Sequence, residues 1–177
     1  MILMQQLKPC LIKIMKSTLT HFDKTGSAQM VDVTDKAETH RIAVAACTVN
    51  LSAQSVQLIK DGDAKKGDVL GVARLAGIMA AKKTSDIIPL CHPLSLSKIS
   101  IEFIINADHN HIGIEATVKT SGKTGVEMEA LTAVSISALT IYDMLKSVDK
   151  SIIIKDTRLL FKDGGKSGTF KNTENLL

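Results

Sequence analysis

The segment TSGKTGVEMEAL, residues 120–131, combines a Gly-Lys-Thr triplet with two glutamates that follow it closely. A P-loop ends in such a triplet, but it also needs an earlier glycine, in the pattern Gly-x4-Gly-Lys-Ser/Thr, to start the turn that wraps the phosphates. Thr117 holds that earlier position here, and Leu160 holds it in a second match, Gly165-Lys166-Ser167. Neither segment is a P-loop, so the two glycine-lysine turns need another explanation.

Glu127 and Glu129 fall in the first turn of a predicted helix, where the helix dipole favours carboxylates whatever else they do. Side chains two positions apart on a helix point away from each other, so these two are not a general acid and base acting on one bond. Backbone N–H groups at this helix start can hold an anion or the edge of a base. The spacing is equally consistent with a purely structural role for the two glutamates.

Cys91 and His92 lie in a short loop between Pro89 and Pro93. A cysteine-histidine pair suggests a metal site or a thiol nucleophile, but adjacent residues supply two metal ligands with poor geometry, so we predict no metal site. The prolines stiffen the loop, which favours presentation of the imidazole to a ligand. The alternative is a histidine that only caps a turn.

Asp143 and Lys146 are three residues apart, on one face near the far end of the same predicted helix. The common explanation of such a pair is a solvated surface ion pair. Because both lie beside the apolar stripe of the helix, we expect a half-buried carboxylate next to an ammonium group. Such a pair can exchange protons with a substrate.

The distance along this helix limits how these residues can cooperate. Glu127 and Asp143 are sixteen residues apart, which is roughly 24 Å at about 1.5 Å per residue. A single chain cannot bring both to one small substrate. If both serve one site, two subunits must build it, as symmetric association allows.

Further cationic residues are candidates for binding an anion, although each alone is more often a solvated surface charge. Lys66 and Lys166 are favoured, because a neighbouring glycine lets the backbone and the ammonium group approach a phosphate together. The other candidates are Lys65, Arg41 and Lys162.

The composition indicates one globular domain that binds a small anionic ligand. A chain of 177 residues buries enough surface to fold without disulfides or a structural metal. The net charge is only +4, and four Phe, one Tyr and no Trp leave little to stack on bases, so we predict no nucleic acid partner. Cys10, Cys47 and Cys91 form no Cys-x-x-Cys pair, which favours reduced thiols and a cytoplasmic location.

No run of the sequence is long and apolar enough to predict a membrane span. Lysines interrupt the apolar N-terminal stretch, so it lacks the core of a secretory signal. We predict a flexible N-terminal extension at 1–29, a domain at 30–170 and a tail at 171–177. An organellar presequence is the alternative for the extension, since no acidic residue precedes Asp23.

The apolar periodicity predicts a βαββαβ order of elements. Alternating or continuous apolar residues predict strands, and apolar residues at helical spacing predict helices. The predicted strand at 41–52 is apolar on both faces, as a strand covered on both sides would be. Asp68 is the predicted N-cap of the first helix. The expected elements are a strand at 41–52, a helix at 65–86, a hairpin at 97–120, a helix at 125–150 and a strand at 151–163. This order is typical of an α+β ferredoxin-like plait, an antiparallel sheet with both helices on one face.

Four segments together resemble the molybdenum cofactor biosynthesis protein C family, the cyclic pyranopterin monophosphate synthases. They are MVDVTDKAETHRIA, KKGDVLGVARLAGIMAAKKTSDIIPLCHPL, SGKTGVEMEALTAVSISALTIYDMLK and RLLFKDGGKSGTF. The resemblance extends from about Met30 to Phe170 and leaves out the first residues. The combination of Leu-Cys-His-Pro-Leu, Gly-Lys-Thr-Gly-Val-Glu-Met-Glu-Ala and Asp-Met-x-Lys makes it highly specific.

The resemblance implies a lyase that converts 3',8-cyclo-7,8-dihydro-GTP to cyclic pyranopterin monophosphate and releases pyrophosphate. It also implies a homohexamer, a trimer of dimers with active sites at subunit interfaces. No cofactor is required, although Mg²⁺ can accompany the triphosphate. The rival hypothesis is a non-catalytic plait that binds nucleotides as a regulator, because a fold does not determine function.

The resemblance also implies a role for individual residues, all of which match the family's motifs. Asp143 matches the catalytic residue, and Lys66 and Lys146 match lysines implicated in proton transfer and phosphate handling. The implied substrate-binding residues are Leu90, Cys91, His92, Glu127, Met128, Glu129, Arg41 and Lys162.

Overall fold

The computed structural model describes residues 21, 23, 25–62 and 67–172. The chain divides into two units, Met1–Val31 and Asp32–Leu177, which are described separately. In the first unit, the Asp23 carboxylate accepts hydrogen bonds from the backbone N–H groups of Thr25 and Ser27, which closes a tight turn. Most of the predicted N-terminal extension and tail lies outside the described residues, so their boundaries remain a prediction.

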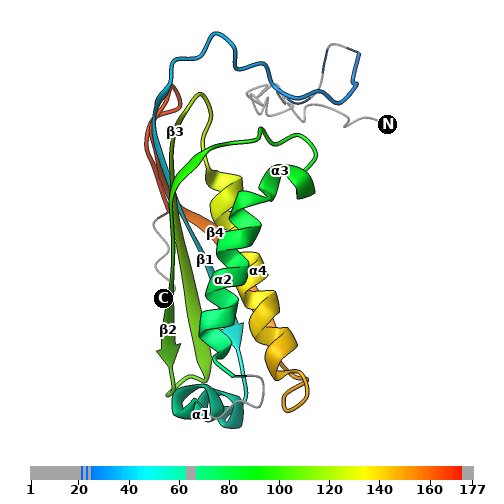
Figure 1. Ribbon diagram of the computed structural model, residues 1–177, viewed down its shortest axis with the longest axis vertical. Helices are drawn as coiled ribbons and strands as arrows, with labels where there is room; N and C mark the ends of the chain where they lie inside the picture. Colours follow the sequence, from blue (N-terminus) through cyan, green and yellow to red (C-terminus); the bar gives the residue numbers. More distant parts are fainter. Residues whose placement is uncertain (1–20, 22, 24, 63–66, 173–177) are drawn as a thin grey trace, which may run out of the picture. The chain divides into compact units, whose positions relative to one another are not determined.

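The second unit contains a five-stranded antiparallel sheet in the order β2-β3-β1-β4-β5 (Figure 1). The strands are β1 (Thr39–Asn50), β2 (Leu96–Asn106), β3 (His111–Gly122), β4 (Ile153–Asp163) and β5 (Phe170–Lys171). The first two strands of the sequence are not neighbours, because β3 lies between them. This arrangement confirms the predicted α+β ferredoxin-like plait, with β5 added at one edge.

Two long helices cover one face of this sheet (Figure 1). The helices are α1 (Ala53–Asp61), α2 (Val69–Lys82), α3 (Thr84–Ile87) and α4 (Glu127–Leu145). Helix α2 packs beside α4, and α4 lies over β1, β3 and β4. The Asp68 carboxylate accepts from the Gly71 N–H at 2.8 Å, which confirms it as the N-cap of α2.

The core lies between the helices and the sheet, as the alternating pattern predicts. Ile101, Ala116 and Val118 are buried on the helix side of β2 and β3. Helices α2 and α4 approach closely at Gly77, where an added Cβ would lie 2.2 Å from the Ser137 hydroxyl oxygen. That hydroxyl donates to the Ala73 carbonyl at 3.0 Å, so this buried polar side chain is satisfied.

Three short elements were absent from the predicted order: α1, α3 and β5. Helix α1 buries only Ser55 and Val56, so its apolar signal is weak. Its ends are nevertheless well defined, since the Ser52 side chain caps the start and Gly62 adopts a left-handed conformation at the end. In the sequence, the capping residues of α1 indicate this helix better than its apolar periodicity does.

Apolar spacing alone does not identify which residues the two long helices bury. Val72 and Met79 of α2 are exposed, and small residues including Ala73 and Gly77 occupy the buried side instead. Helix α4 ends at Leu145, so Val148 lies beyond it and is exposed. Apolar periodicity therefore identified both helices but does not separate their buried residues from exposed apolar ones.

In the described part of the chain, helices cover β1 on one face, whereas the sequence predicted cover on both sides. Ala46 and Thr48 point to the other face, yet both are buried. Ala46 is paired with Glu115 of β3 and Arg158 of β4. Larger side chains of the neighbouring strands can therefore shield this central strand without a second layer.

Asp149 ties the end of α4 to the start of α1. Its carboxylate accepts from the Ser52 N–H at 2.7 Å, the Ser55 hydroxyl at 3.1 Å and the Ser151 hydroxyl at 2.7 Å. Burial alone would raise the pKa of this carboxyl, but the hydrogen bonds from Ser151 and Ser52 hold it well below its usual range. The C-terminal end of α4 is therefore firmly anchored.

By length and composition, α4 is apolar enough to cross a membrane, although the sequence predicted no such segment. Half of the apolar 18-residue stretch of α4 is buried, and the buried residues pack against the sheet and α2. This packing is that of a core helix.

Candidate active site

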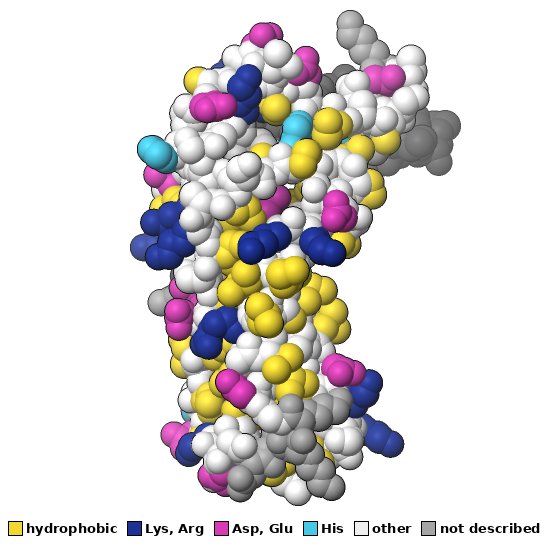
Figure 2. Space-filling view, in the orientation of Figure 1, with side chains coloured by type: hydrophobic (Ala, Val, Ile, Leu, Met, Phe, Trp, Pro, Cys, Tyr) yellow, Lys and Arg dark blue, Asp and Glu magenta, His cyan; other side chains and the backbone are white. Residues whose placement is uncertain are grey.

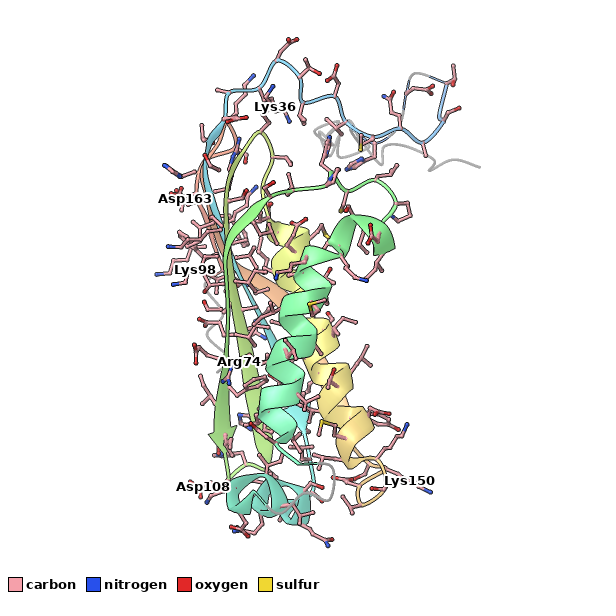
Figure 3. All side chains as sticks on the ribbon, in the orientation of Figure 1. Lys36, Arg74, Lys98, Asp108, Lys150 and Asp163 are labelled. Atoms are coloured by element: carbon pink, nitrogen blue, oxygen red, sulfur yellow. The ribbon has the colours of Figure 1, made fainter. Side chains whose placement is uncertain are left out.

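A pocket of about 830 Å³ opens at the end of the sheet where α4 begins. Its volume suits a ligand of nucleotide size. Both glycine-lysine turns line it: Lys123 and Gly125 come from the turn between β3 and α4, and Gly165 and Lys166 from the turn between β4 and β5. The segment before β1 supplies the remaining wall, and Lys36 and Asp163 lie at this end (Figure 3). The two failed P-loop matches thus belong to one pocket.

Arg41 joins the two turns. Only 9% of this residue is exposed, and its guanidinium donates from Nε to the Gly122 carbonyl at 3.3 Å and from Nη1 to the Gly164 carbonyl at 3.1 Å. Gly165 has φ +78°, and a Cβ there would lie 1.5 Å from Arg41 Nη1. A side chain at this position would need a rarely adopted backbone conformation and would displace the Arg41 guanidinium from its hydrogen bonds.

Lys162 and Glu127 form an ion pair inside the pocket. The Lys162 ammonium donates to Glu127 Oε1 at 2.9 Å and to the Ser167 hydroxyl at 3.1 Å. Both side chains are more than two thirds buried. An incoming phosphate would compete with Glu127 for this ammonium group.

The pocket is rich in cations, and sequence reasoning had not proposed two of them, Lys36 and Lys123, for anion binding. Lys123 had no expected role, and it donates to the Thr34 carbonyl at 2.6 Å. Within the described part of the chain, Lys36 and Lys166 have no side-chain hydrogen bond or ion pair. The cationic lining residues are Lys36, Arg41, Lys123, Lys162 and Lys166, and the acidic ones are Asp35, Glu127 and Asp163. The excess of cations favours an anionic ligand.

Glu129 and Cys91 form a second group at the same end of α4. Glu129 is 4% exposed, and burial, with a smaller effect from the nearby Glu127 charge, raises its pKa to about 7. Burial and the Glu129 charge likewise raise the pKa of the Cys91 thiol. A raised thiol pKa disfavours the thiolate that a nucleophilic cysteine needs. Leu90 and His92 flank Cys91 and are half-buried, and Met128 precedes Glu129.

Asp143 and Lys146 lie at the opposite end of α4. Their side chains form an ion pair of 2.6 Å. Both are more than half exposed, at 59% and 53%, so the expected half-buried carboxylate is wrong for the single chain. Hydrogen bonding with Asp143, followed by its charge, raises the pKa of Lys146.

The structure therefore divides the predicted site residues between two ends of one helix. Arg41, Glu127 and Lys162 line the pocket, with Cys91 and Glu129 near the same helix end, whereas Asp143 and Lys146 lie about 24 Å away by helix geometry. Lys66 lies outside the described residues. Among the residues described, no group of three His, Cys, Asp or Glu side chains is arranged to hold a metal ion.

Comparison with known proteins gives a match to the MoaC family model over residues 30–165. The chain belongs to the MoaC family. Its curated relatives include cyclic pyranopterin monophosphate synthases from Dinoroseobacter shibae and Clostridium perfringens. The first is 62% identical over 155 residues, covering 88% of this chain and 98% of the relative. The second is 59% identical over 156 residues, covering 88% and 99%. The family-model match includes both ends of α4 and the pocket residues up to Gly165, but not Lys166 and Ser167.

We expect Gly165→Ala to destabilise the protein more than Gly168→Ala. Both glycines have positive φ in one turn, but only an Ala at 165 would collide with Arg41, while nothing lies within 4 Å of a Cβ at 168. The φ strain costs about 1–2 kcal/mol at either position, and the collision should add about 1–3 kcal/mol at 165. Urea unfolding measures the free energy of unfolding of both variants. Equal losses of stability would show that Arg41 does not constrain the turn.

We also expect Glu129→Gln to change how stability depends on pH. The ordinary carboxyl pKa of 4.5 is raised to about 7 in the folded chain. Between these values the unfolded state loses its proton first, so the wild type should lose stability as pH rises from about 4.5 to 7. Glutamine has no such titration. As pH rises from about 4.5 to 7, the melting temperature of the variant should therefore increase relative to that of the wild type. A difference in melting temperature that does not change with pH would contradict the raised pKa.

Proposed function

We propose that this protein is a lyase of molybdenum cofactor biosynthesis. It converts 3',8-cyclo-7,8-dihydroguanosine 5'-triphosphate to cyclic pyranopterin monophosphate and releases pyrophosphate. The observation that carries the proposal is the similarity, over 88% of the chain, to enzymes named cyclic pyranopterin monophosphate synthase. The cationic pocket supports it, because the substrate brings a triphosphate.

The pocket holds the phosphates in this proposal. Arg41 and Lys162 supply fixed positive charge from neighbouring strands. Closure of the cyclic phosphate expels pyrophosphate, and the charge that develops on this leaving group is stabilised by cations already in place. No covalent enzyme intermediate is needed. Any Mg²⁺ enters with the triphosphate, and the chain requires no other cofactor.

The other residues move protons or hold the pterin. Opening the purine-derived ring and closing the pterin require several proton transfers, which we assign to Asp143, Lys66 and Lys146. Glu129, with a pKa of about 7, can hold or release a proton near neutral pH. The remaining binding residues are Leu90, Cys91, His92, Glu127 and Met128.

The active form is a homohexamer built as a trimer of dimers, located in the cytoplasm. Each site takes Asp143 and Lys146 from one subunit and the pocket from another, because one rigid helix keeps them apart. The partners in this account are the small-molecule substrate and further copies of the chain, with no nucleic acid or membrane.

The direct test of the reaction is incubation of the purified protein with the cyclised GTP derivative. We expect stoichiometric pyrophosphate and the cyclic pterin product, measured by a coupled pyrophosphate assay and by mass spectrometry. Asp143→Asn is the matched inactive control. Binding of the substrate without either product would favour the rival account, a regulatory plait that only binds nucleotides.

Mixing of inactive subunits tests whether the site is shared. Asp143→Asn and Lys162→Ala should each lower activity at least about tenfold, since a lost charge-assisted contact costs about 1.5–3 kcal/mol. After subunit exchange, mixed assemblies contain some sites with neither defect, so activity should recover to about a quarter of the wild type by random pairing. Exchange is monitored with fluorescently labelled subunits. Exchange without recovery would show that each chain contains a complete site.

A further inference from the structure

The Glu127 side chain folds back over the start of its own helix. A Cβ added at Gly125 would overlap the Glu127 carboxylate, whose Cδ would lie only 2.7 Å away. Gly125 does not have a positive φ, so the backbone at this position does not itself favour glycine. The missing side chain instead leaves the space that the carboxylate occupies.

This space is where the pocket would hold an anion. Helix α4 begins at Glu127, and its N-cap, Val126, makes no side-chain hydrogen bond to the first turn. The first N–H groups of a helix lack partners within the helix and favour negative charge. Lys162 approaches the same carboxylate from β4, at 2.9 Å from its Oε1. The carboxylate therefore lies beside the two kinds of group that a bound phosphate uses.

Glu127 differs from the other acidic residues of the pocket. Figure 2 shows acidic and basic side chains mixed at the end of the molecule where Figure 3 labels Lys36 and Asp163. The Asp163 carboxylate accepts a hydrogen bond from the Thr169 hydroxyl at 2.6 Å. Within the described part of the chain, Glu127 is the acidic lining residue that forms an ion pair with a lining cation. It therefore occupies the ammonium group that an anionic ligand needs.

A phosphate cannot simply join this ion pair. The Lys162 ammonium has three N–H donors, and two of them already bond Glu127 and the Ser167 hydroxyl. A phosphate against the ammonium would lie a few ångströms from the carboxylate, and two anions so close in a partly buried site repel each other. Because 30% of the Glu127 side chain is exposed, the carboxylate can turn toward solvent.

We propose that Glu127 is an internal occupant of the phosphate site, and that a phosphate group of the ligand displaces it from Lys162. This inference rests on the proposed function, which places the phosphates in this pocket. Lys162 stays paired with an anion before and after the exchange. The displaced carboxylate becomes free for the contact with the rest of the substrate proposed above. Every phosphate ligand must first break the ion pair, so it binds more weakly than the cations alone would allow.

Pyrophosphate binding to the full-length protein tests the exchange, because this probe lacks the rest of the substrate. Glu127→Gln keeps the shape of the side chain but removes its charge. We expect its dissociation constant for pyrophosphate, measured by isothermal titration calorimetry, to fall about fivefold or more, as the loss of a competing ion pair of this kind predicts. Asp163→Asn is the matched control, since it removes one negative charge from the same pocket without breaking the pair. Its effect should be less than about twofold, as for a charge that is screened by solvent.

Gly125→Ala tests the position of the carboxylate without changing any charge. The added Cβ meets the far end of a flexible side chain, so the carboxylate leaves this space while the backbone stays in place. We expect this variant also to bind pyrophosphate more tightly than the wild type. Gly122→Ala is the control in the same segment, because the nearest atom to its Cβ is 3.7 Å away. It should leave the affinity unchanged.

Tighter binding in Glu127→Gln and in Gly125→Ala, but not in the two controls, supports the proposal. Unchanged or weaker binding in Glu127→Gln overturns it, as does the same result in a Gly125→Ala protein whose circular dichroism shows it to be folded. A gain in Asp163→Asn equal to that in Glu127→Gln also overturns it, because general charge would then explain both. Equal binding by all the proteins leaves the proposed reaction intact, whereas binding by none also removes the phosphate role of the pocket.

Discussion

The rest of the structure depends on the rigidity of one helix. Helix α4 runs from Glu127 to Leu145 and is buried along its length against the sheet and α2. Gly77 allows α2 to approach it closely, and Asp149 anchors its C-terminal end. A helix held in this way cannot bend to bring its two ends together. If polar groups at its two ends serve one site, as we propose, they must therefore meet through another copy of the chain.

The pocket end depends on a second constraint, the buried guanidinium of Arg41. It binds the carbonyls of Gly122 and Gly164, so two turns that are distant in the sequence face one cavity. Lysines from both turns then concentrate positive charge without a P-loop. Nearby, burial raises the pKa of the Cys91 thiol and moves the Glu129 pKa to about 7. The same short region thus combines fixed positive charge with a carboxyl group that titrates near neutrality.

Sequence patterns predicted the plait because its strands alternate clearly and its two long helices are strongly apolar. They also placed Glu127 and Asp143 at opposite ends of one helix, since the rise per residue is constant. They could not show that the two glycine-lysine turns meet, because that depends on the pairing of β1 with both β3 and β4. Nothing in the sequence around Lys36 indicated that this residue lines the pocket. Val72 and Met79 share the helical spacing of the buried Val69, although they are exposed, because an exposed apolar stripe and a buried one look alike in sequence.

The central claim is that each site joins the pocket of one copy to Asp143 of another. A crystal structure of the assembled protein with bound pyrophosphate measures this most directly. The account predicts that the partner's Asp143 lies within about 10 Å of the first turn of α4, as expected for packed helices, with pyrophosphate bound to Lys162. If every Asp143 in the assembly lies about 24 Å or more from each pocket, as within one chain, the account is contradicted.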